Sequence, residues 1–325
     1  MRLNEPAHVK ELLRDVLPIE VIDARDRFYR EMLGLSDAEE KRIRFREVFY
    51  KVLSGGVARE YGCDWLVQGT IAPDWIETRG GGIKTQHNVL EQIGIDTASK
   101  YGFKLIEPLR ELYKDQVREL AKALGVPSEI VNRQPFPGPG LSIRAVGELT
   151  LEKLDVVRRA TEIVERRLGG GMGLSQWFAA AWEYDAAPSE DLSRVINGLG
   201  NLKAYIFRVR ATGVKGDSRS YGNVVLVRGG DPGNWGGLIY DLYRYLGTAR
   251  DVTHVIYELM GGRGFGKYFV SIRAVLTEDF MTADVARMPQ DTLMGIAQEI
   301  LGSDERVAAV GYDVTPKPPA TIEYE

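Results

Sequence analysis

The segment from Phe136 to Leu141 constrains the fold of this chain more than any other feature of its sequence. It reads Phe-Pro-Gly-Pro-Gly-Leu. Proline fixes φ and lacks a backbone donor, so two consecutive Pro-Gly pairs exclude a helix or a central strand. We expect a stiff loop with exposed backbone, flanked by Arg133 and Arg144. Two interpretations stay open: a rigid linker between domains, or a loop whose amides and flanking guanidinium groups contact a phosphate or a planar base.

Strand and helix signals alternate before this loop. Short apolar runs predict strands at 17–22, 65–67 and 104–106, the second of them buried. Residues 40–50 and 115–124 predict helices. Such alternation favours an α/β fold, in which helices flank a parallel sheet.

The pattern changes after the loop. Thr150 can cap a helix whose apolar stripe ends at Leu168, with Gly169 as its stop. Residues 282–301 predict a second helix, interrupted near Pro289. Four further runs are rich in strand-forming residues, at 204–210, 224–228, 268–275 and 307–314. The second part is therefore predicted to be an α+β domain.

Length and composition limit the class of protein. The chain has 325 residues, 44% hydrophobic and 27% charged, which suits two globular domains, placed at 1–144 and 145–325. A net charge of -4 and a pI of ≈ 5.7 argue against nucleic acid or an anionic membrane as a partner. A single cysteine, Cys63, excludes an intramolecular disulfide, and with only three histidines we expect no dedicated metal site. The sequence has neither a membrane-spanning apolar run nor a signal-peptide core, which predicts a cytoplasmic protein.

Glycine is frequent, at 36 residues, and gathers in patches at 80–82, 169–173 and 229–266. Because glycine is unfavourable inside helices and strands, we interpret these patches as loop insertions or mobile segments. Ser54-Gly55-Gly56-Val57 looks like the opening of a pyrophosphate-binding loop. Such loops follow a buried strand, whereas helix-like residues precede this one, so a loop insertion is the preferred interpretation.

Two polar segments of the first domain can carry chemistry. Gln68-Gly69-Thr70 follows a predicted strand, where ligands bind in open parallel sheets, although an ordinary turn explains it equally well. Asp74, Glu77, Lys84 and His87 lie in a glycine-interrupted stretch. Its carboxylates can hold Mg²⁺ or orient an amine, and its lysine can neutralise a transferring group under a mobile lid. A solvated polar loop is the alternative.

Two segments of the second domain are also candidates. Residues 216–222 connect two strand runs, either as a surface turn or with Arg219 as a phosphate ligand. The run from Lys317 to Glu325 holds two prolines and alternating charges directly after a strand. It either docks into a site or frays as most chain ends do.

These segments occur together, in order, in one family. The chain resembles GMP synthase, in its ATP-pyrophosphatase and dimerisation domains, from about residue 17 to the end. The matching stretches are Gly34 to Arg42, Gln68 to Asp74, Ile83 to Asn88, Glu107 to Asp115, Arg133 to Leu141, Gly216 to Tyr221, Met281 to Asp284, and the run from Lys317.

The resemblance implies an ATP-dependent ligase of purine biosynthesis. GMP synthases adenylylate the C2 oxygen of xanthosine monophosphate with ATP, and ammonia then displaces AMP to give GMP. Mg²⁺ is held mainly by the nucleotide phosphates. Ammonia comes from a glutamine amidotransferase, which this chain lacks, so a separate glutaminase subunit is implied, together with a homodimer.

The resemblance also carries over residue roles. Asp74, Glu77, Lys84 and His87 match the family's mobile lid, where the lysine supports adenylyl transfer. The family often has a histidine where this chain has Gln86. The ATP-binding residues implied are Gln68, Gly69 and Thr70. Those implied for xanthosine monophosphate are Arg27, Arg133, Gly138, Pro139, Gly140, Arg219, Lys317, Ile322 and Glu323, with the Arg219 loop reaching a site shared across two subunits.

The sequence also departs from the family. The family's first strand, its Ser-Gly-Gly-Val-Asp-Ser-Ser pyrophosphate loop, the following helix and the second strand have no counterpart here. The segments 169–201 and 229–266 are long insertions that exceed the family's usual dimerisation domain. We expect a start codon assigned too late or a shortened chain, and an exposed apolar sheet edge. Three interpretations remain: an active ligase whose natural chain is longer, a non-catalytic remnant that binds xanthosine monophosphate or dimerises, and a related enzyme acting on RNA or NAD precursors.

Overall fold

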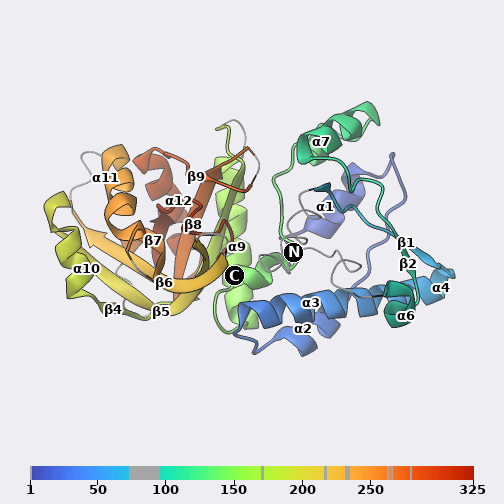
Figure 1. Ribbon diagram of the computed structural model, residues 1–325, viewed down its shortest axis with the longest axis horizontal. Helices are drawn as coiled ribbons and strands as arrows, with labels where there is room; N and C mark the ends of the chain where they lie inside the picture. The colour runs from blue at the N-terminus through green and yellow to red at the C-terminus, as the bar shows by residue number, and fades with distance from the viewer. Residues whose placement is uncertain are drawn as a thin grey trace. The chain divides into compact units, whose positions relative to one another are not determined.

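The computed structural model describes residues 2–72, 96–169, 172–215, 218–230, 235–249, 251–261, 264, 266–278 and 280–325. The chain forms two compact units, one of residues 4–139 and one of residues 1–3 with 140–325. Figure 1 draws the first in blue to green and the second in light green to red. Each unit is described by itself.

A parallel pair of strands and an aromatic cluster organise the unit of residues 4–139. Strand β1 (Trp65–Val67) pairs in parallel with β2 (Lys104–Ile106), as predicted. Tyr50, Tyr101 and Phe103 form the buried cluster, against which Leu66 and Leu105 pack. The helices are α1 (Glu5–Leu12), α2 (Arg25–Met32), α3 (Ala38–Val52), the π-helical η1 (Leu53–Ala58), α4 (Arg59–Tyr61), α6 (Thr97–Tyr101), α7 (Lys114–Ala123) and α8 (Ser128–Val131).

Three predictions for this unit need correction. Residues 17–22 form no strand: Leu17, Val21 and Ile22 are 47%, 48% and 47% exposed. An apolar run becomes a strand only where a neighbouring strand satisfies its backbone hydrogen bonds, and the described residues supply none here.

The run at 65–67 is a strand but not a buried one, because only one face of the sheet meets the aromatic cluster. Trp65 and Val67 on the other face are 54% and 65% exposed. Residues 53–58 continue α3 as a π-helix instead of forming a loop.

A single mixed sheet organises the unit that contains residues 140–325. Its strand order is β3-β8-β10-β7-β6-β5-β4, and β9 pairs with β8. The β8–β10 and β6–β7 pairs are parallel, and the other pairs are antiparallel. The strands are β3 (Gln176–Glu183), β4 (Ala186–Pro188), β5 (Leu202–Lys215), β6 (Ser218–Gly229), β7 (Val252–Gly261), β8 (Tyr268–Leu276), β9 (Asp284–Val285) and β10 (Val307–Asp313).

Helices cover this sheet. The long helix α9 (Leu151–Leu168) packs on β3, and α12 (Gln290–Ser303) packs on β10, β7 and α9 (Figure 1). The Thr150 hydroxyl accepts a hydrogen bond from the Lys153 amide at 3.1 Å, so the predicted cap of α9 is confirmed. The shorter helices are η2 (Gly140–Ile143), α10 (Glu190–Val195), η3 (Asn197–Leu199), α11 (Trp235–Leu242) and η4 (Tyr243–Gly247).

Two predictions for this unit were wrong. The glycine-rich segments 169–201 and 229–266 are not loop insertions, because they supply β3 and the interior strand β7. Some of their glycines lie in helices, such as Gly236 in α11 and Gly247 in η4, while apolar runs between the glycines form strands of the sheet. The predicted helix at 282–301 begins only at Gln290, directly after Pro289. The residues before that proline include β9, which pairs with β8.

The C-terminal segment is buried against the sheet of its own unit. Lys317, Thr321 and Ile322 are 9%, 8% and 8% exposed, and Tyr324 is 0% exposed. The frayed alternative is therefore wrong, and docking into a ligand site remains a prediction. Among the helices of the described residues, none has the length and apolar character needed to cross a membrane.

Candidate functional site

The C-terminal segment brings several predicted site residues into one region. The Lys317 backbone exchanges two hydrogen bonds with Ala283, at 2.8 and 3.0 Å. Its ammonium group donates to the carbonyl of Phe280. The Ile322 carbonyl accepts from the Arg273 guanidinium at 2.8 Å. These contacts hold the segment in place on both sides of its prolines.

Arg144 joins the end of the Pro-Gly loop to the C-terminal segment. Gly140, with φ +66°, opens the short turn η2, and Arg144 directly follows that turn. The buried guanidinium of Arg144 holds both carboxylate oxygens of Glu323, each at 2.9 Å. The Gln176 amide donates to the same carboxylate at 2.6 Å. Glu323 therefore has a fixed orientation, with 11% of its side chain exposed.

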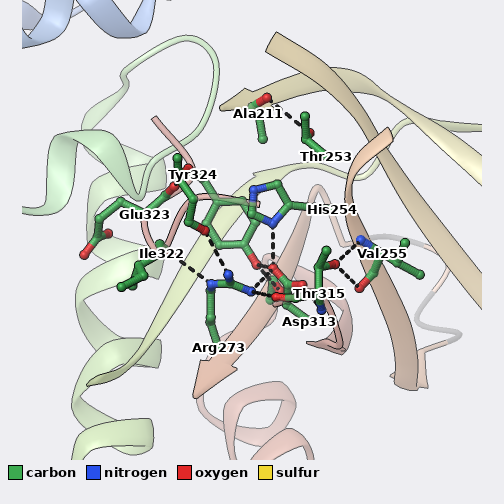
Figure 2. Close-up of polar contacts among 12 residues, drawn as sticks. Ala211, Thr253, His254, Val255, Arg273, Asp313, Thr315, Ile322, Glu323 and Tyr324 are labelled. Carbon is green, nitrogen blue, oxygen red and sulfur yellow. Dashed lines mark hydrogen bonds and ion pairs between the residues drawn. The ribbon is translucent and has the colours of Figure 1, made fainter. Parts of the chain in front are cut away.

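A second buried polar cluster lies beneath this segment (Figure 2). Asp313 on β10 accepts from the Tyr324 hydroxyl at 2.7 Å and lies 2.7 Å from the Arg273 guanidinium. The Nδ1 atom of His254, on β7, lies 2.7 Å from Asp313, and its Nε2 lies 3.1 Å from the carbonyl of Thr212. The side chains of His254, Arg273 and Asp313 are 0% exposed.

The charges of this cluster set its protonation. Burial alone would raise the pKa of Asp313, but the charges of Arg273 and His254 outweigh it and hold that pKa well below its usual range. Burial and the neighbouring carboxylate raise the pKa of Tyr324 well above its usual value. Near neutral pH, Asp313 is thus ionised and Tyr324 is neutral.

This cluster was missed in the sequence. Its signal was present, because His254, Arg273 and Asp313 each interrupt or end an otherwise apolar strand run. A charged residue inside such a run must be buried with a partner or face a ligand. The strand predictions at 268–275 and 307–314 rested on apolar residues and did not consider Arg273 and Asp313, and the strand that holds His254 was not predicted.

Polar side chains also meet at the carboxyl ends of the parallel strands β1 and β2. Gln68 follows β1 and donates from its amide to the Thr70 hydroxyl at 2.9 Å. Thr70 in turn donates to Glu107, the residue that follows β2. Tyr50 donates to the Gln68 side-chain oxygen at 2.7 Å. Burial raises the pKa of Tyr50. Among the described residues outside its chain neighbours, none has an atom within 4 Å of the Cβ position at Gly69, so on this side its backbone is open to approach.

The other predicted residues have separate surroundings. Arg27 is exposed and borders a hollow with Arg30, Val48 and Lys51. Arg133 forms an ion pair with Glu5. Arg219 pairs with Val214 in the β5–β6 hairpin. Gly138 is exposed and Pro139 is buried. Asp74, Glu77, Lys84 and His87 lie outside the described residues, as does part of the 216–222 turn.

Comparison with models of known protein families identifies the class of protein. The family model of the GMP synthase C terminal domain matches residues 245–324, and that of NAD synthase matches residues 85–155. The chain thus combines an ATP-pyrophosphatase domain of the NAD synthase type with a GMP synthase C-terminal domain, and the predicted fold class is confirmed.

Comparison with individual proteins shows the family to which the chain belongs. The chain is 49% identical to a protein of Saccharolobus solfataricus that is named as one subunit of a glutamine-hydrolyzing GMP synthase, over 100% of this chain and 84% of the relative. It is 47% identical to the protein of that name from Sulfurisphaera tokodaii and 39% identical to that of Archaeoglobus fulgidus, covering 84% and 81% of them. The chain belongs to this family of GMP synthase subunits.

Proposed function

We propose that this protein converts xanthosine monophosphate to GMP at the expense of ATP, releasing AMP and pyrophosphate. The observation that carries the proposal is the docked C-terminal segment, which presents Lys317 and the fixed Glu323 carboxylate within the region matched by the GMP synthase C terminal domain. A lysine ammonium suits the 5′-phosphate, and a carboxylate can accept hydrogen bonds from the N–H groups of the base. Arg27, Arg133, Arg219 and the Gly138–Gly140 backbone belong to the same proposed acceptor site.

The reaction has two steps. The C2 oxygen of xanthosine monophosphate attacks the α-phosphorus of ATP, and the bond to pyrophosphate breaks. Ammonia then attacks C2, AMP leaves with the oxygen, and a proton is lost to give the amine of GMP. In the proposal Lys84 neutralises charge during adenylyl transfer, while Asp74, Glu77 and His87 belong to the same lid.

ATP is proposed to lie at the carboxyl ends of β1 and β2. Gln68, Thr70 and Glu107 meet there, and the open backbone at Gly69 leaves room for a nucleotide. Among the described residues, no cluster of three or more carboxylate, histidine or cysteine groups could hold a metal. Mg²⁺ is accordingly proposed to arrive with the ATP phosphates.

The proposal includes a second protein. The name of the Saccharolobus solfataricus relative denotes one subunit of a glutamine-hydrolysing enzyme. We assign ammonia supply to a glutamine amidotransferase subunit, and we further propose a homodimer that works in the cytoplasm.

The test is pyrophosphate release by the purified protein with ATP, Mg²⁺, ammonium and xanthosine monophosphate. We expect release that depends on xanthosine monophosphate and equals the GMP formed. Omitting the acceptor is the first control. Nicotinic acid adenine dinucleotide is the second, because the NAD synthase family matches residues 85–155. Release with this second acceptor in place of xanthosine monophosphate, or no release at all, would overturn the proposal.

A further inference from the structure

One buried guanidinium holds both ends of the loop that carries Lys317. Arg273 donates from Nη1 to the carbonyl of Thr315 at 3.1 Å. It also donates from Nη2 to Thr321 and from Nε to Ile322, both at 2.8 Å. These carbonyls lie before and after Lys317, so the loop cannot change conformation without breaking bonds to this one group. Figure 2 shows the arrangement around Arg273.

Asp313 and Tyr324 fix the position of that guanidinium and of the chain beyond it. Asp313 lies 2.7 Å from Arg273 and accepts from the Tyr324 hydroxyl, which also lies 2.8 Å from the Ser271 hydroxyl. The Tyr324 ring stacks on His254, with ring centroids 4.5 Å apart. Tyr324 is thus tied to strands β7, β8 and β10, and Glu323 is the residue directly before it.

His254 brings strand β7 into the cluster. Its two ring nitrogens face the Asp313 carboxylate and the Thr212 carbonyl, which are both acceptors when Asp313 is ionised. The titratable and charged groups around it are Asp313 on β10, Arg273 on β8 and Tyr324 in the C-terminal segment. Buried polar arrays whose members are hydrogen-bonded make the chain around them more rigid.

We propose that Arg273, Asp313 and Tyr324 are positioning residues for the nucleotide acceptor: they hold residues 315–324 in the one conformation that presents Lys317 and Glu323 to it. The inference rests on the proposed function and deepens it, because it concerns how the same site is preorganised. Preorganisation reduces the cost of ordering a segment upon binding. A purely structural role would stabilise the unit and leave nucleotide affinity unchanged.

The test compares Tyr324→Phe with Tyr312→Phe. Both tyrosines are fully buried in the same unit. The Tyr312 hydroxyl donates to the carbonyls of Ala286 and Ala274, outside the C-terminal segment. Each variant removes one buried hydroxyl and keeps the aromatic ring, so losses of general stability are matched.

For Tyr324→Phe we expect the Kd of xanthosine monophosphate, measured by titration calorimetry, to rise roughly tenfold, as does its KM, with kcat within about twofold of wild type. Hydrogen exchange in peptides that cover 315–325 should also accelerate. For Tyr312→Phe we expect affinity and KM within about twofold of wild type. Thermal unfolding of both variants establishes that they are folded at the assay temperature.

The outcomes separate the two proposals. If wild type binds xanthosine monophosphate and forms GMP, but Tyr324→Phe binds as wild type does, the positioning role is wrong and the proposed function stands. If both substitutions weakened the binding of xanthosine monophosphate equally, the positioning role would also be wrong. The loss of affinity would then follow from lower stability of the whole unit. If wild type neither binds xanthosine monophosphate nor forms GMP, the proposed function fails and this inference fails with it.

Discussion

Two buried arginines hold different parts of the C-terminal segment. Arg144 forms a bidentate pair with the Glu323 side chain, and Arg273 holds backbone carbonyls at both ends of the Lys317 loop. Both tasks need several donors in a fixed plane, which a lysine cannot supply. The sequence pattern indicated Arg144 as a flank of the Pro-Gly loop, but a partner 179 residues away can be found only when the chain is folded.

Replacing Lys317 tests the acceptor site at the scale of one residue. For Lys317→Ala we expect binding of xanthosine monophosphate to weaken by roughly 1.5–3 kcal/mol, the range for a charge-assisted hydrogen bond. Titration calorimetry gives the change directly. Lys267→Ala is the matched control, because that lysine belongs to the same unit and its side chain is 54% exposed. Unchanged binding by Lys317→Ala would remove this residue from the proposed site.

The Asp313 carboxylate should make the stability of its unit sensitive to acid. Its pKa in the folded protein lies below the ordinary value of 3.8, so the unfolded state binds the proton more tightly. The stability that it contributes is fully present above that ordinary value and is lost as the pH falls below it. In thermal unfolding, Asp313→Asn should be less stable than wild type by about 3–5 kcal/mol near pH 7, because Arg273 loses its buried partner.

The difference in unfolding free energy between Asp313→Asn and wild type should then become smaller as the pH falls from about 5 to about 3. Asp191→Asn is the control, since the side chain of Asp191 is 91% exposed. The unfolding free energy of Asp191→Asn should differ little from that of wild type at both pH values. A constant gap in unfolding free energy for Asp313→Asn over this range would show that folding does not lower the pKa of the Asp313 carboxyl.

At the scale of the element, glycine content predicted the positions of strands poorly, whereas apolar runs predicted most of them well. The strands around 204–210, 224–228, 268–275 and 307–314 formed where apolar residues predicted them. Strand β7 was missed because it lies in a segment with many glycines, although its own sequence from Val252 to Leu259 has none. The strand predicted at 17–22 does not form, although its residues are apolar. Local composition cannot show whether a neighbouring strand exists to pair with it.

Gly311 of β10 illustrates why some glycines belong inside this sheet. A Cβ there would lie 2.7 Å from side-chain atoms of Ile256 and Phe269 and 2.8 Å from the Tyr257 carbonyl. Gly311→Ala should therefore destabilise the protein by about 1–3 kcal/mol, as measured by denaturant unfolding.

Gly302 provides the matched comparison for that substitution. It lies in α12, and within the part of the chain that the structure describes no atom beyond its own helical turn comes within 4 Å of its Cβ position. Gly302→Ala should be neutral or stabilise the protein by up to about 1 kcal/mol, because alanine favours helix. Equal effects of the two substitutions would mean that the close approach around Gly311 is not the cause.

At the scale of the whole molecule, the sequence predicted the family better than it predicted the contacts. Ordered motifs along the chain indicated the GMP synthase family, and the relatives confirm it. Short motifs retain the residues that meet a ligand, so they can be compared without a structure. The division at 1–144 and 145–325 remains a prediction, as do the roles of Asp74, Glu77, Lys84 and His87. The buried cluster of His254, Arg273 and Asp313 depends on strands that are distant in sequence, which a motif cannot reveal.

The source of ammonia is also a question for the whole molecule. Hydrolysis of glutamine by a cysteine enzyme needs a thiolate activated by a neighbouring base. This chain has one cysteine, Cys63, which is exposed, with its sulfur 3.7 Å from the Tyr61 carbonyl. Within the described residues, His8 is held by Glu129 at 2.6 Å and His254 is enclosed in the buried cluster. We therefore expect the protein alone to form GMP with ammonium but not with glutamine.

Adding the amidotransferase subunit should make glutamine a donor, and Cys63→Ser should leave both reactions unchanged. GMP formation with each donor, with and without the second subunit, measures this directly. Loss of the glutamine reaction alone in Cys63→Ser would place the glutaminase chemistry in this chain and contradict a division of labour between subunits. Persistence of both reactions would mean that this chain supplies nucleotide activation and amination, while its partner supplies only ammonia.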